Sequence, residues 1–536
     1  MSRLLSFLLI LLAFGTSVPA MAQTLDPGPA ASLTVLEGGR FKPLDSFAWE
    51  SVRSIYGKSH YKDKAGKRWG ATELVLSMAS QPDLWADAPM VRVDFLELKE
   101  RLGLPLHEKY FSYNQLRNSE QLSPLVEEAR KVSGKPDLAT KLTRETEMLY
   151  GRLGLLDALL SGYGFHIMPD SNGEWLSPME APDAARNAWI DGLVAWRDGN
   201  PTAFENAFAS LRQVQQASGA KLATDTVIQR ELLYNKLQPF QTALYLYLSL
   251  ILVAILASIW KIAPIRWLGM VLLLAGLAFH STGLVLITLI TGRAPVSNLF
   301  ESMVFISWTM ILFTTLFYFF SRRENYLVLI AGVLGGLSMF YALDSTIDIS
   351  INPLVPVLRS YWLNIHVTII TASYGAFALA AGLGHVYLYR YRSNPRDTTF
   401  LNKVDMLNLR SVQLGTVLLT AGVILGAVWA NESWGRYWGW DPKETWSLIT
   451  LLLYLAVIHG RLNGWADRVK TAVFTVAGFA AVLMTYFGVN YYLTGLHSYA
   501  TGNPDPVPLK LLVYLALETA FVVWCLRMGK AQLKAA

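Results

Sequence analysis

Long apolar segments divide this sequence into two parts. From Pro239 onward, apolar stretches of about 20 residues follow one another with short polar connections, and about 20 residues is the length that a helix needs to cross a bilayer. We predict an all-α fold in which a polytopic helical membrane bundle follows a mainly helical soluble domain. The nine predicted spans lie near residues 241–260, 266–290, 302–320, 326–343, 364–389, 411–430, 445–460, 470–492 and 509–527.

The first part of the chain is more polar, and its apolar residues recur with a helical period. Residues 1–22 have the pattern of a secretory signal peptide, with Arg3 before an apolar run and Ala20-Met21-Ala22 as the cleavage site. An uncleaved anchor is the alternative, and either one places residue 23 outside the cytoplasm. We therefore predict an extracytoplasmic domain over residues 23–238 and a membrane domain over residues 239–536. Helices are expected at 71–78, 94–102, 136–160 and 225–237.

The basic residues give the membrane domain an orientation. If residue 240 lies outside, the inner connections hold 15 Lys and Arg residues and the outer connections hold 5. This asymmetry follows the positive-inside rule and agrees with the signal peptide. We expect a multi-pass protein of the bacterial inner membrane with its soluble domain on the periplasmic side. The net charge of +6 reflects this topology, so it indicates no nucleic-acid partner.

Composition excludes several classes of protein. With 53% hydrophobic and 16% charged residues, the chain is too apolar for a soluble enzyme. Its one cysteine, Cys525, lies in the last predicted span. A disulfide framework, a Cys-x-x-Cys redox pair and a covalent c-type haem site of its own are therefore excluded.

The connection between the sixth and seventh spans is rich in aromatic residues. In the predicted loop 434–441, Trp434, Tyr437, Trp438 and Trp440 fall within seven residues of one another, around two glycines. One or two such rings are typical membrane-interface anchors, whereas four in one loop favour a binding surface. The next residues, Asp441-Pro442-Lys443-Glu444, combine an N-cap, a proline in the first turn and a capping-box carboxylate, so a helix is predicted to begin at residue 442.

Two histidines flank this loop at the same predicted depth. His366 lies at the outer start of the fifth span, and His497 lies in the connection after the eighth span. Neutral imidazoles are good iron ligands, and aromatic rings pack well on a flat apolar macrocycle. The joint placement favours axial ligation of a haem, although either residue alone is as readily an interfacial histidine.

Two further histidines lie within the predicted spans. His280 is at mid-depth in the second span, and His459 is near the inner end of the seventh. An ionisable side chain in hydrocarbon is a functional candidate. The two are candidates to share a second haem, but the sequence leaves open whether they meet, and His459 is also compatible with a solvated helix end. We interpret the remaining histidines as structural: His60, His107, His166 and His385.

The segment 434–448, WGRYWGWDPKETWSL, resembles the tryptophan-rich WWD signature of the haem-handling proteins of cytochrome c maturation. Its ending, DPKETW, is similar to the CcsA (ResC) branch of system II. Matching stretches occur at residues 295–302, 362–366 and 495–499, so the resemblance covers roughly residues 265–527.

This resemblance implies that the chain carries haem to the outer membrane face and presents it on the Trp-rich loop for thioether attachment to apocytochrome c. The haem would be b-type, bound without a covalent link while in transit. By the resemblance, His366 and His497 ligate the presented haem iron, and His459 ligates haem within the membrane. The companion of His459 in fused relatives comes from a CcsB (ResB) portion, which this chain does not show. A separate CcsB/ResB-like subunit is therefore expected, and His280 is the alternative ligand.

The implied reaction adds the two thiols of a Cys-x-x-Cys-His motif across the haem vinyl groups. This would be holocytochrome c synthase activity, carried out with the partner subunit. The contribution of this chain would be positioning. Arg436 is a candidate to pair a haem propionate, and no catalytic residue is assigned. The haem-binding surface predicted beside the histidines consists of Trp434, Trp438, Trp440 and Asp441.

Two other functions remain open from the sequence. A cytochrome b-type electron-transfer subunit would place histidine pairs at matched depth on facing helices. A transporter of another apolar ligand would use the Trp-rich loop as a gate and would need no iron ligand. Purification without a haem absorbance band would favour the transporter.

Overall fold

The structure is a computed structural model that describes residues 25–135, 138–170, 172–321, 323–344, 347–354, 360–493, 495–497 and 509–534. The predicted signal peptide, residues 1–22, lies outside the described residues, as do Ser498 and Tyr499 of the matching stretch at 495–499. The chain divides into two compact units. The first takes the residues up to Glu37, Phe41–Glu128 and Glu145–Ile228, and the second takes Gly38–Arg40, Ala129–Arg144 and the residues from Gln229 onward.

The polar part of the chain is mainly helical, as its periodicity predicts. Three of the four predicted helices form as α4, α6 and α9, and the fourth forms as α12 (Asp225–Leu237), which spans the boundary between the two units at residue 228. The other helices are short or amphipathic. In chain order, the helices up to residue 217 are α2 (Gly28–Ala31), α3 (Leu44–Tyr56), α4 (Ala71–Ser80), α5 (Pro82–Ala86), α6 (Leu96–Arg101), α7 (Tyr113–Arg117), α8 (Leu122–Val132), α9 (Lys141–Ser161), α10 (Asp183–Asp198) and α11 (Pro201–Ala217).

The strands of this part form four separate two-stranded pairs. The first is a hairpin whose turn, Gly38-Gly39, has positive φ at both residues, a conformation that glycine adopts without strain. In the second pair, His60 is opposite Gly70 and the strands are antiparallel. The pairs are β1 (Thr34–Glu37) with β2 (Arg40–Pro43), β3 (His60–Lys62) with β4 (Arg68–Gly70), β5 (Val91–Arg92) with β6 (Tyr110–Phe111), and β7 (Met168–Pro169) with β8 (Trp175–Leu176).

A cluster of aromatic rings lies in the core of the first unit. Trp189 of α10 is fully buried, and its ring lies 4.9 Å from that of Phe165 and 5.8 Å from that of Phe208 on α11. Gly192, one turn after Trp189, allows this close packing, because a Cβ there would lie 2.5 Å from the Phe208 ring. Such rings contribute a large buried apolar area from few residues.

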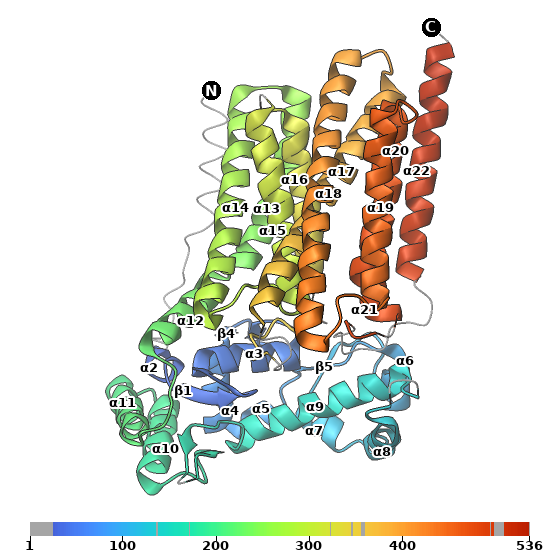
Figure 1. The fold of residues 1–536 in the computed structure, drawn as a ribbon. Coiled ribbons are helices and arrows are strands. Elements are labelled where there is room, and N and C mark those ends of the chain that lie inside the picture. Colours follow the sequence, from blue (N-terminus) through green and yellow to red (C-terminus); the bar gives the residue numbers. More distant parts are fainter. Residues whose placement is uncertain are drawn as a thin grey trace. The chain divides into compact units, whose positions relative to one another are not determined.

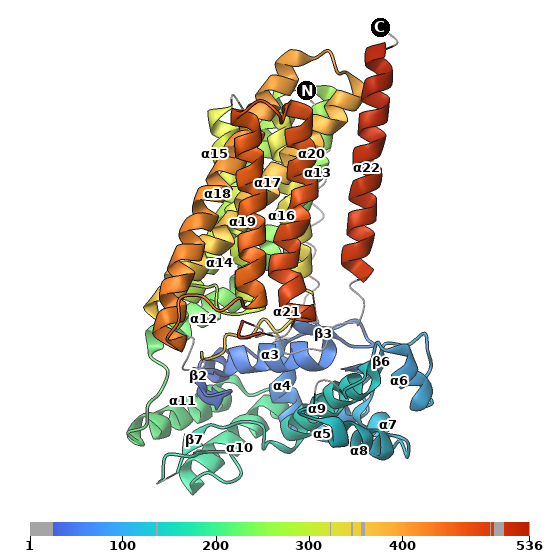
Figure 2. The same ribbon diagram turned by 45° about the vertical axis from the view of Figure 1, so that its right-hand side comes forward.

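The apolar part of the chain forms a helical bundle (Figures 1 and 2). Among the described residues, nine helical segments are long and apolar enough to cross a membrane, which confirms the predicted number of spans. Gln238, in a left-handed conformation before Pro239, separates α12 from the helix that follows. The helices are α13 (Pro239–Trp260), α14 (Ala263–Thr291), α15 (Leu299–Phe320), α16 (Asn325–Ala342), α17 (Tyr361–Ser393), α18 (Thr398–Trp434), α19 (Pro442–Leu462), α20 (Arg468–Leu483), the π-helix η2 (Met484–Gly488), α21 (Val489–Tyr492) and α22 (Leu509–Lys534).

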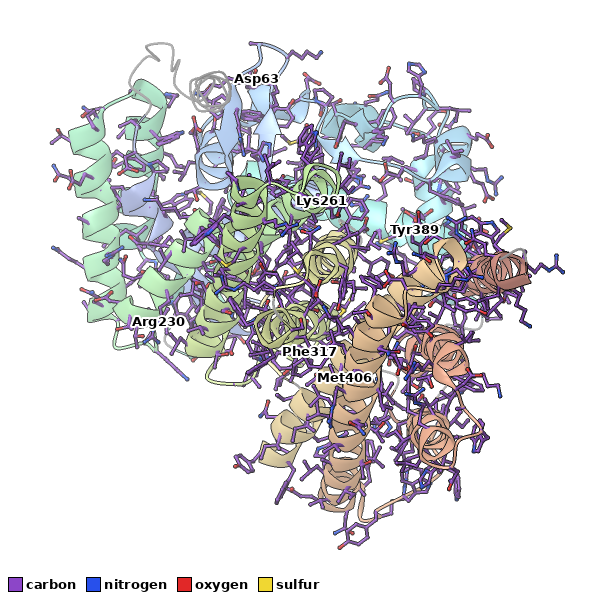
Figure 3. All side chains as sticks on the ribbon, turned by 90° about the horizontal axis from the view of Figure 1, so that it is seen from above. Asp63, Arg230, Lys261, Phe317, Tyr389 and Met406 are labelled. Atoms are coloured by element: carbon purple, nitrogen blue, oxygen red, sulfur yellow. The ribbon has the colours of Figure 1, made fainter. Side chains whose placement is uncertain are left out.

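Small residues bring the central helices together. A Cβ on Gly415 of α18 would lie 2.6 Å from the ring of Phe377 on α17, and a Cβ on Gly384 would lie 2.7 Å from Thr475 on α20. The Phe377 ring also stacks on Tyr454 of α19 at 3.8 Å. Figure 3 views the bundle along its helices, from the end where Lys261 and Tyr389 lie. Close packing through small residues is what associates helices in lipid, where apolar burial contributes little.

Charged groups concentrate near the helix ends of this bundle. At one end, Asp405 accepts a hydrogen bond from Arg461 at 2.8 Å and lies 3.6 Å from Arg468. At the other end, buried Glu301 pairs with Arg293 through two hydrogen bonds of 2.6 and 2.9 Å. The two ends therefore carry separate polar networks, and the end with Arg293 is the one where His366 and His497 lie.

Candidate functional site

The Trp-rich loop, residues 434–441, begins at Trp434, the last residue of α18, and joins α18 to α19. Gly435 ends α18 in a left-handed conformation, and its N–H donates to the carbonyl of Asn431 at 2.9 Å. Pro442 begins α19, with Asp441 as N-cap and Glu444 completing the capping box, which confirms the predicted helix start. Trp440 has a φ of 58°, which is uncommon for a residue with a Cβ and stores strain in the loop.

Glu444 holds the loop in this shape. Its buried carboxylate accepts hydrogen bonds from the backbone N–H of Gly439 at 2.7 Å and of Asp441 at 3.1 Å. Arg436 pairs with the same carboxylate at 3.3 Å, and its guanidinium lies over the Trp434 ring. A Cβ on Gly439 would overlap that guanidinium. Arg436 is thus bound into the loop and is not among the residues that line the cavity described below.

Asp441 connects the loop to His497. The imidazole Nδ1 of His497 donates to the Asp441 carboxylate at 2.8 Å, and the backbone N–H of Leu496 donates to its other oxygen at 2.6 Å. Burial opposes ionisation of this carboxyl, but the hydrogen bonds from His497 and from the backbone of Lys443 and Leu496 outweigh burial and lower the Asp441 pKa to about 2. Asp441 is therefore an ionised acceptor, and the Nδ1 proton belongs to His497.

His366 has the same arrangement on α17. Its Nδ1 donates to the backbone carbonyl of Gly422 on α18 at 2.7 Å. A Cβ on Gly426, one turn later, would lie 2.6 Å from the imidazole, so glycine leaves the space that the ring occupies. In both histidines Nδ1 donates, so the neutral imidazole presents the lone pair of Nε2.

Trp429 brings the two imidazoles together. Its buried indole is parallel to the His366 ring, at 7° and 6.4 Å, and lies 5.8 Å from the His497 ring. Trp434 completes the cluster, at 4.7 Å from Trp429 and 5.0 Å from His497. Residues far apart in sequence thus converge on one indole.

Both histidines line a cavity of about 630 Å³. A volume of this size is typical of sites for organic ligands and cofactors. From the Trp-rich loop, Tyr437 and Trp438 line it, whereas Trp440 is 69% exposed and lies edge-on to Trp438 at 5.9 Å. Aromatic and polar residues from α17, η2 and α21 form much of the remaining wall, including Tyr374, Tyr486 and Asn490.

The donor set fits an iron porphyrin. Metal-binding histidines characteristically donate their second ring N–H to a carboxylate or a backbone carbonyl, which orients the ring and raises its basicity. His497 has the carboxylate and His366 has the carbonyl. With two available Nε2 atoms and a cavity walled by aromatic rings, these residues have the chemistry that axial ligation of a haem requires.

The structure does not bring His280 and His459 together. His280 is fully buried between α13 and α15, where its Nε2 donates to the Val304 carbonyl at 2.9 Å and the Tyr247 hydroxyl lies 3.2 Å from its Nδ1. Both of its nitrogens are therefore in use. His459 lies exposed on α19, with its Nδ1 bonded to the Leu455 carbonyl of its own helix at 2.8 Å.

His385 has a partner that the sequence does not reveal. Its Nε2 lies 2.9 Å from the carboxylate of Glu518 on α22, which joins α22 to α17. Sequence reasoning also missed most of the residues that line the cavity, among them Trp429, Tyr374, Lys443 and Tyr486. Lys443 and Trp429 border the Trp-rich loop, and their position beside it was the available signal.

Comparisons with known proteins match the part of the chain that contains this site. The family model for cytochrome c assembly proteins matches residues 296–497, a range that contains both histidines and the loop. Protein NrfI of Wolinella succinogenes is 33% identical over 525 residues, which cover 90% of this chain and 56% of NrfI. Cytochrome c biogenesis protein CcsA of a Synechococcus species is 35% identical over 47% of this chain and 93% of its own length. The solved structure of the cytochrome c heme lyase CcmF has a TM-score of 0.43 at 19% identity over 58% of this chain and 53% of its own, too low to bear on function.

Proposed function

Because this chain belongs to the cytochrome c assembly family, as a multi-pass membrane protein of the CcsA type, we propose that it presents haem for attachment to apocytochrome c. Haem would be held without a covalent link between His366 and His497, beside the Trp-rich loop. The site would lie at the outer face of a bacterial inner membrane, as the positive-inside count indicates. The chain spans 56% of NrfI, so neither the activity nor the partners of that whole protein are assumed.

One observation carries this proposal. His366 and His497 each have Nδ1 engaged by an acceptor, each pack on Trp429, and each line the same cavity. A pair of structural histidines has no need of a shared cavity, nor of free Nε2 atoms on both rings. A cytochrome b-type function would instead need a ligand pair among the spans, and the fully buried His280 has both nitrogens hydrogen-bonded.

In the attachment reaction, the S–H bond of each substrate cysteine breaks and adds across a vinyl C=C bond. Sulfur bonds to the carbon next to the ring and hydrogen to the terminal carbon, so no oxidant is consumed. The residues of this chain would orient the porphyrin and leave one axial position exchangeable for the histidine of the substrate. His497 is the exchangeable candidate, because the Asp441 that holds it belongs to a loop, whereas His366 is anchored between two long helices.

A CcsB/ResB-like subunit is proposed as the partner in this synthase activity. His459 supports the assignment because its ring is exposed on α19 rather than enclosed by the described helices. A histidine of the partner would complete a second haem site within the membrane. With both nitrogens in use, His280 has a weaker claim to that role.

The test is the haem absorbance of the purified full chain, expressed with and without a CcsB-like partner. His366→Ala and His497→Ala should each lose most of the Soret band, because each removes one axial ligand. His107→Ala is the control, since this histidine is exposed and far from the site in sequence. Full haem content in both site variants would contradict the proposal, and a native chain that never shows a haem band would favour transport of another apolar ligand.

A further inference from the structure

Within the cavity, two buried donors have no acceptor. The Tyr374 hydroxyl and the Trp429 indole N–H are buried and make no hydrogen bond in the part of the chain that the structure describes. Tyr374 is 3% exposed and Trp429 is 1% exposed, and both residues line the cavity. A buried donor without a partner costs free energy that a ligand oxygen would recover.

Lys443 adds a positive charge to the same cavity. Its ammonium donates to the Asn490 amide oxygen at 3.2 Å. Two other cations near the site are paired, Arg293 with Glu301 and Arg436 with Glu444. Among the described residues that line the cavity, Lys443 is thus the cation with no carboxylate at salt-bridge distance.

One continuous wall joins these groups. Asn490, which receives the Lys443 hydrogen bond, donates to the backbone carbonyl of Tyr486 at 2.7 Å. The Tyr486 ring lies 6.1 Å from that of Tyr374. Tyr486 belongs to η2, and π-helical turns of this kind often occur at functional sites, where the extra residue changes the direction of side chains.

We propose that Lys443 and Tyr374 form a carboxylate subsite that receives the propionates of the bound porphyrin. This inference rests on the proposed function and replaces Arg436 as the propionate partner. An ammonium and a hydroxyl can compensate the charge of a carboxylate in a desolvated site. Hydrogen bonds from such groups to an ionised carboxylate are stronger than hydrogen bonds between neutral groups.

The subsite would set the orientation of the ligand. Propionates and vinyl groups occupy opposite edges of protoporphyrin. Holding the propionates against the wall formed by Lys443, Asn490, Tyr486 and Tyr374 turns the vinyl edge away from it, toward an approaching thiol. His366 and His497 alone would hold the iron but would not distinguish this orientation from its reverse.

The test compares two probes on the purified full chain in lipid nanodiscs: metal-free protoporphyrin IX and its dimethyl ester, followed by quenching of tryptophan fluorescence. Neither probe has iron, so histidine ligation does not contribute. The native chain should favour the diacid, and Lys443→Gln and Tyr374→Phe should each reduce that preference about tenfold. Lys443→Arg should retain it. Lys470→Gln and Tyr454→Phe are matched controls, since Lys470 belongs to α20 outside the cavity and the Tyr454 hydroxyl is also buried and unpartnered but does not line it.

An unchanged preference in both Lys443→Gln and Tyr374→Phe would overturn the subsite and leave the proposed function standing. Failure of the native chain to prefer the diacid would overturn the subsite, whereas a native chain that shows no haem band would overturn the proposed function. Because the variants share one lipid composition, partitioning of the probes into the bilayer cancels in the comparison. Haem spectra of the same variants separate the two cases, since His366 and His497 remain in place.

Discussion

Replacing Asp441 by Asn tests whether the carboxylate behind His497 acts on haem binding. Asn keeps one oxygen as an acceptor, so it is a good N-cap for α19. It removes the negative charge and replaces one carboxylate oxygen by an NH2 group. In the native chain one oxygen accepts the Leu496 N–H at 2.6 Å and the other accepts the His497 N–H at 2.8 Å. One of those two hydrogen bonds must therefore be lost.

The expected effect appears both in haem binding and in stability. A hydrogen bond to a charged group contributes about 1.5–3 kcal/mol, so loss of one should lower the free energy of unfolding by about that amount. Loss of the group that orients a metal-binding histidine typically lowers metal affinity by about 10–100-fold, and we expect haem affinity to fall within that range. Asp441→Ala should also lose the N-cap, at a further cost of about 0.5–2 kcal/mol.

The assay is a haem titration of the purified chain, monitored by Soret absorbance. Asp467→Asn is the matched control, because Asp467 is the N-cap of α20, accepts from the Lys470 N–H at 2.8 Å and has no histidine contact among the described residues. If Asp441→Asn binds haem as tightly as the native chain while His497→Ala does not, the carboxylate does not orient the ligand and this reasoning is wrong.

Three further predictions follow from single contacts. Gly426→Ala should displace the His366 ring, since the added Cβ would lie 2.6 Å from it. Haem content, measured at the Soret band, should fall sharply. Gly269→Ala is the control and should bind haem normally, because the nearest atom to its added Cβ is 3.5 Å away. Arg293→Ala leaves buried Glu301 unpaired and should destabilise the chain by about 3–5 kcal/mol. Thermal unfolding should show that the Arg293→Ala/Glu301→Gln double variant recovers stability. Equal stability of the single and the double variant would refute the pairing. The Asp441 pKa is lowered from 3.8 to about 2, so the ionised carboxylate stabilises the fold above about pH 4, and this stabilisation is lost as pH falls toward about 2. The stability difference between the native and Asp441→Asn proteins should therefore be constant at neutral pH and shrink in acid. A difference that already shrinks near pH 6 would show that it does not come from the Asp441 carboxylate.

The sequence by itself determined the features that depend on neighbouring residues. Nine spans follow from the lengths of the apolar runs, and the start of α19 follows from Asp441, Pro442 and Glu444. The depth of His366 and His497 follows from their positions at the ends of predicted spans. Such features could be predicted because helix length, capping and membrane depth are local properties of the chain.

Only the tertiary structure decided which atoms are available for chemistry. The acceptors for His366 and His497, the Gly422 carbonyl and Asp441, each lie 56 residues away in sequence, and they leave Nε2 as the free nitrogen. Helix packing likewise engages both ring nitrogens of His280, one with the Val304 carbonyl and one with the Tyr247 hydroxyl. The loop itself decided that Arg436 pairs with Glu444, because a positive φ at Trp440 folds the chain back on itself. Helix packing and loop geometry, which no local pattern encodes, determine where each polar group finds its partner.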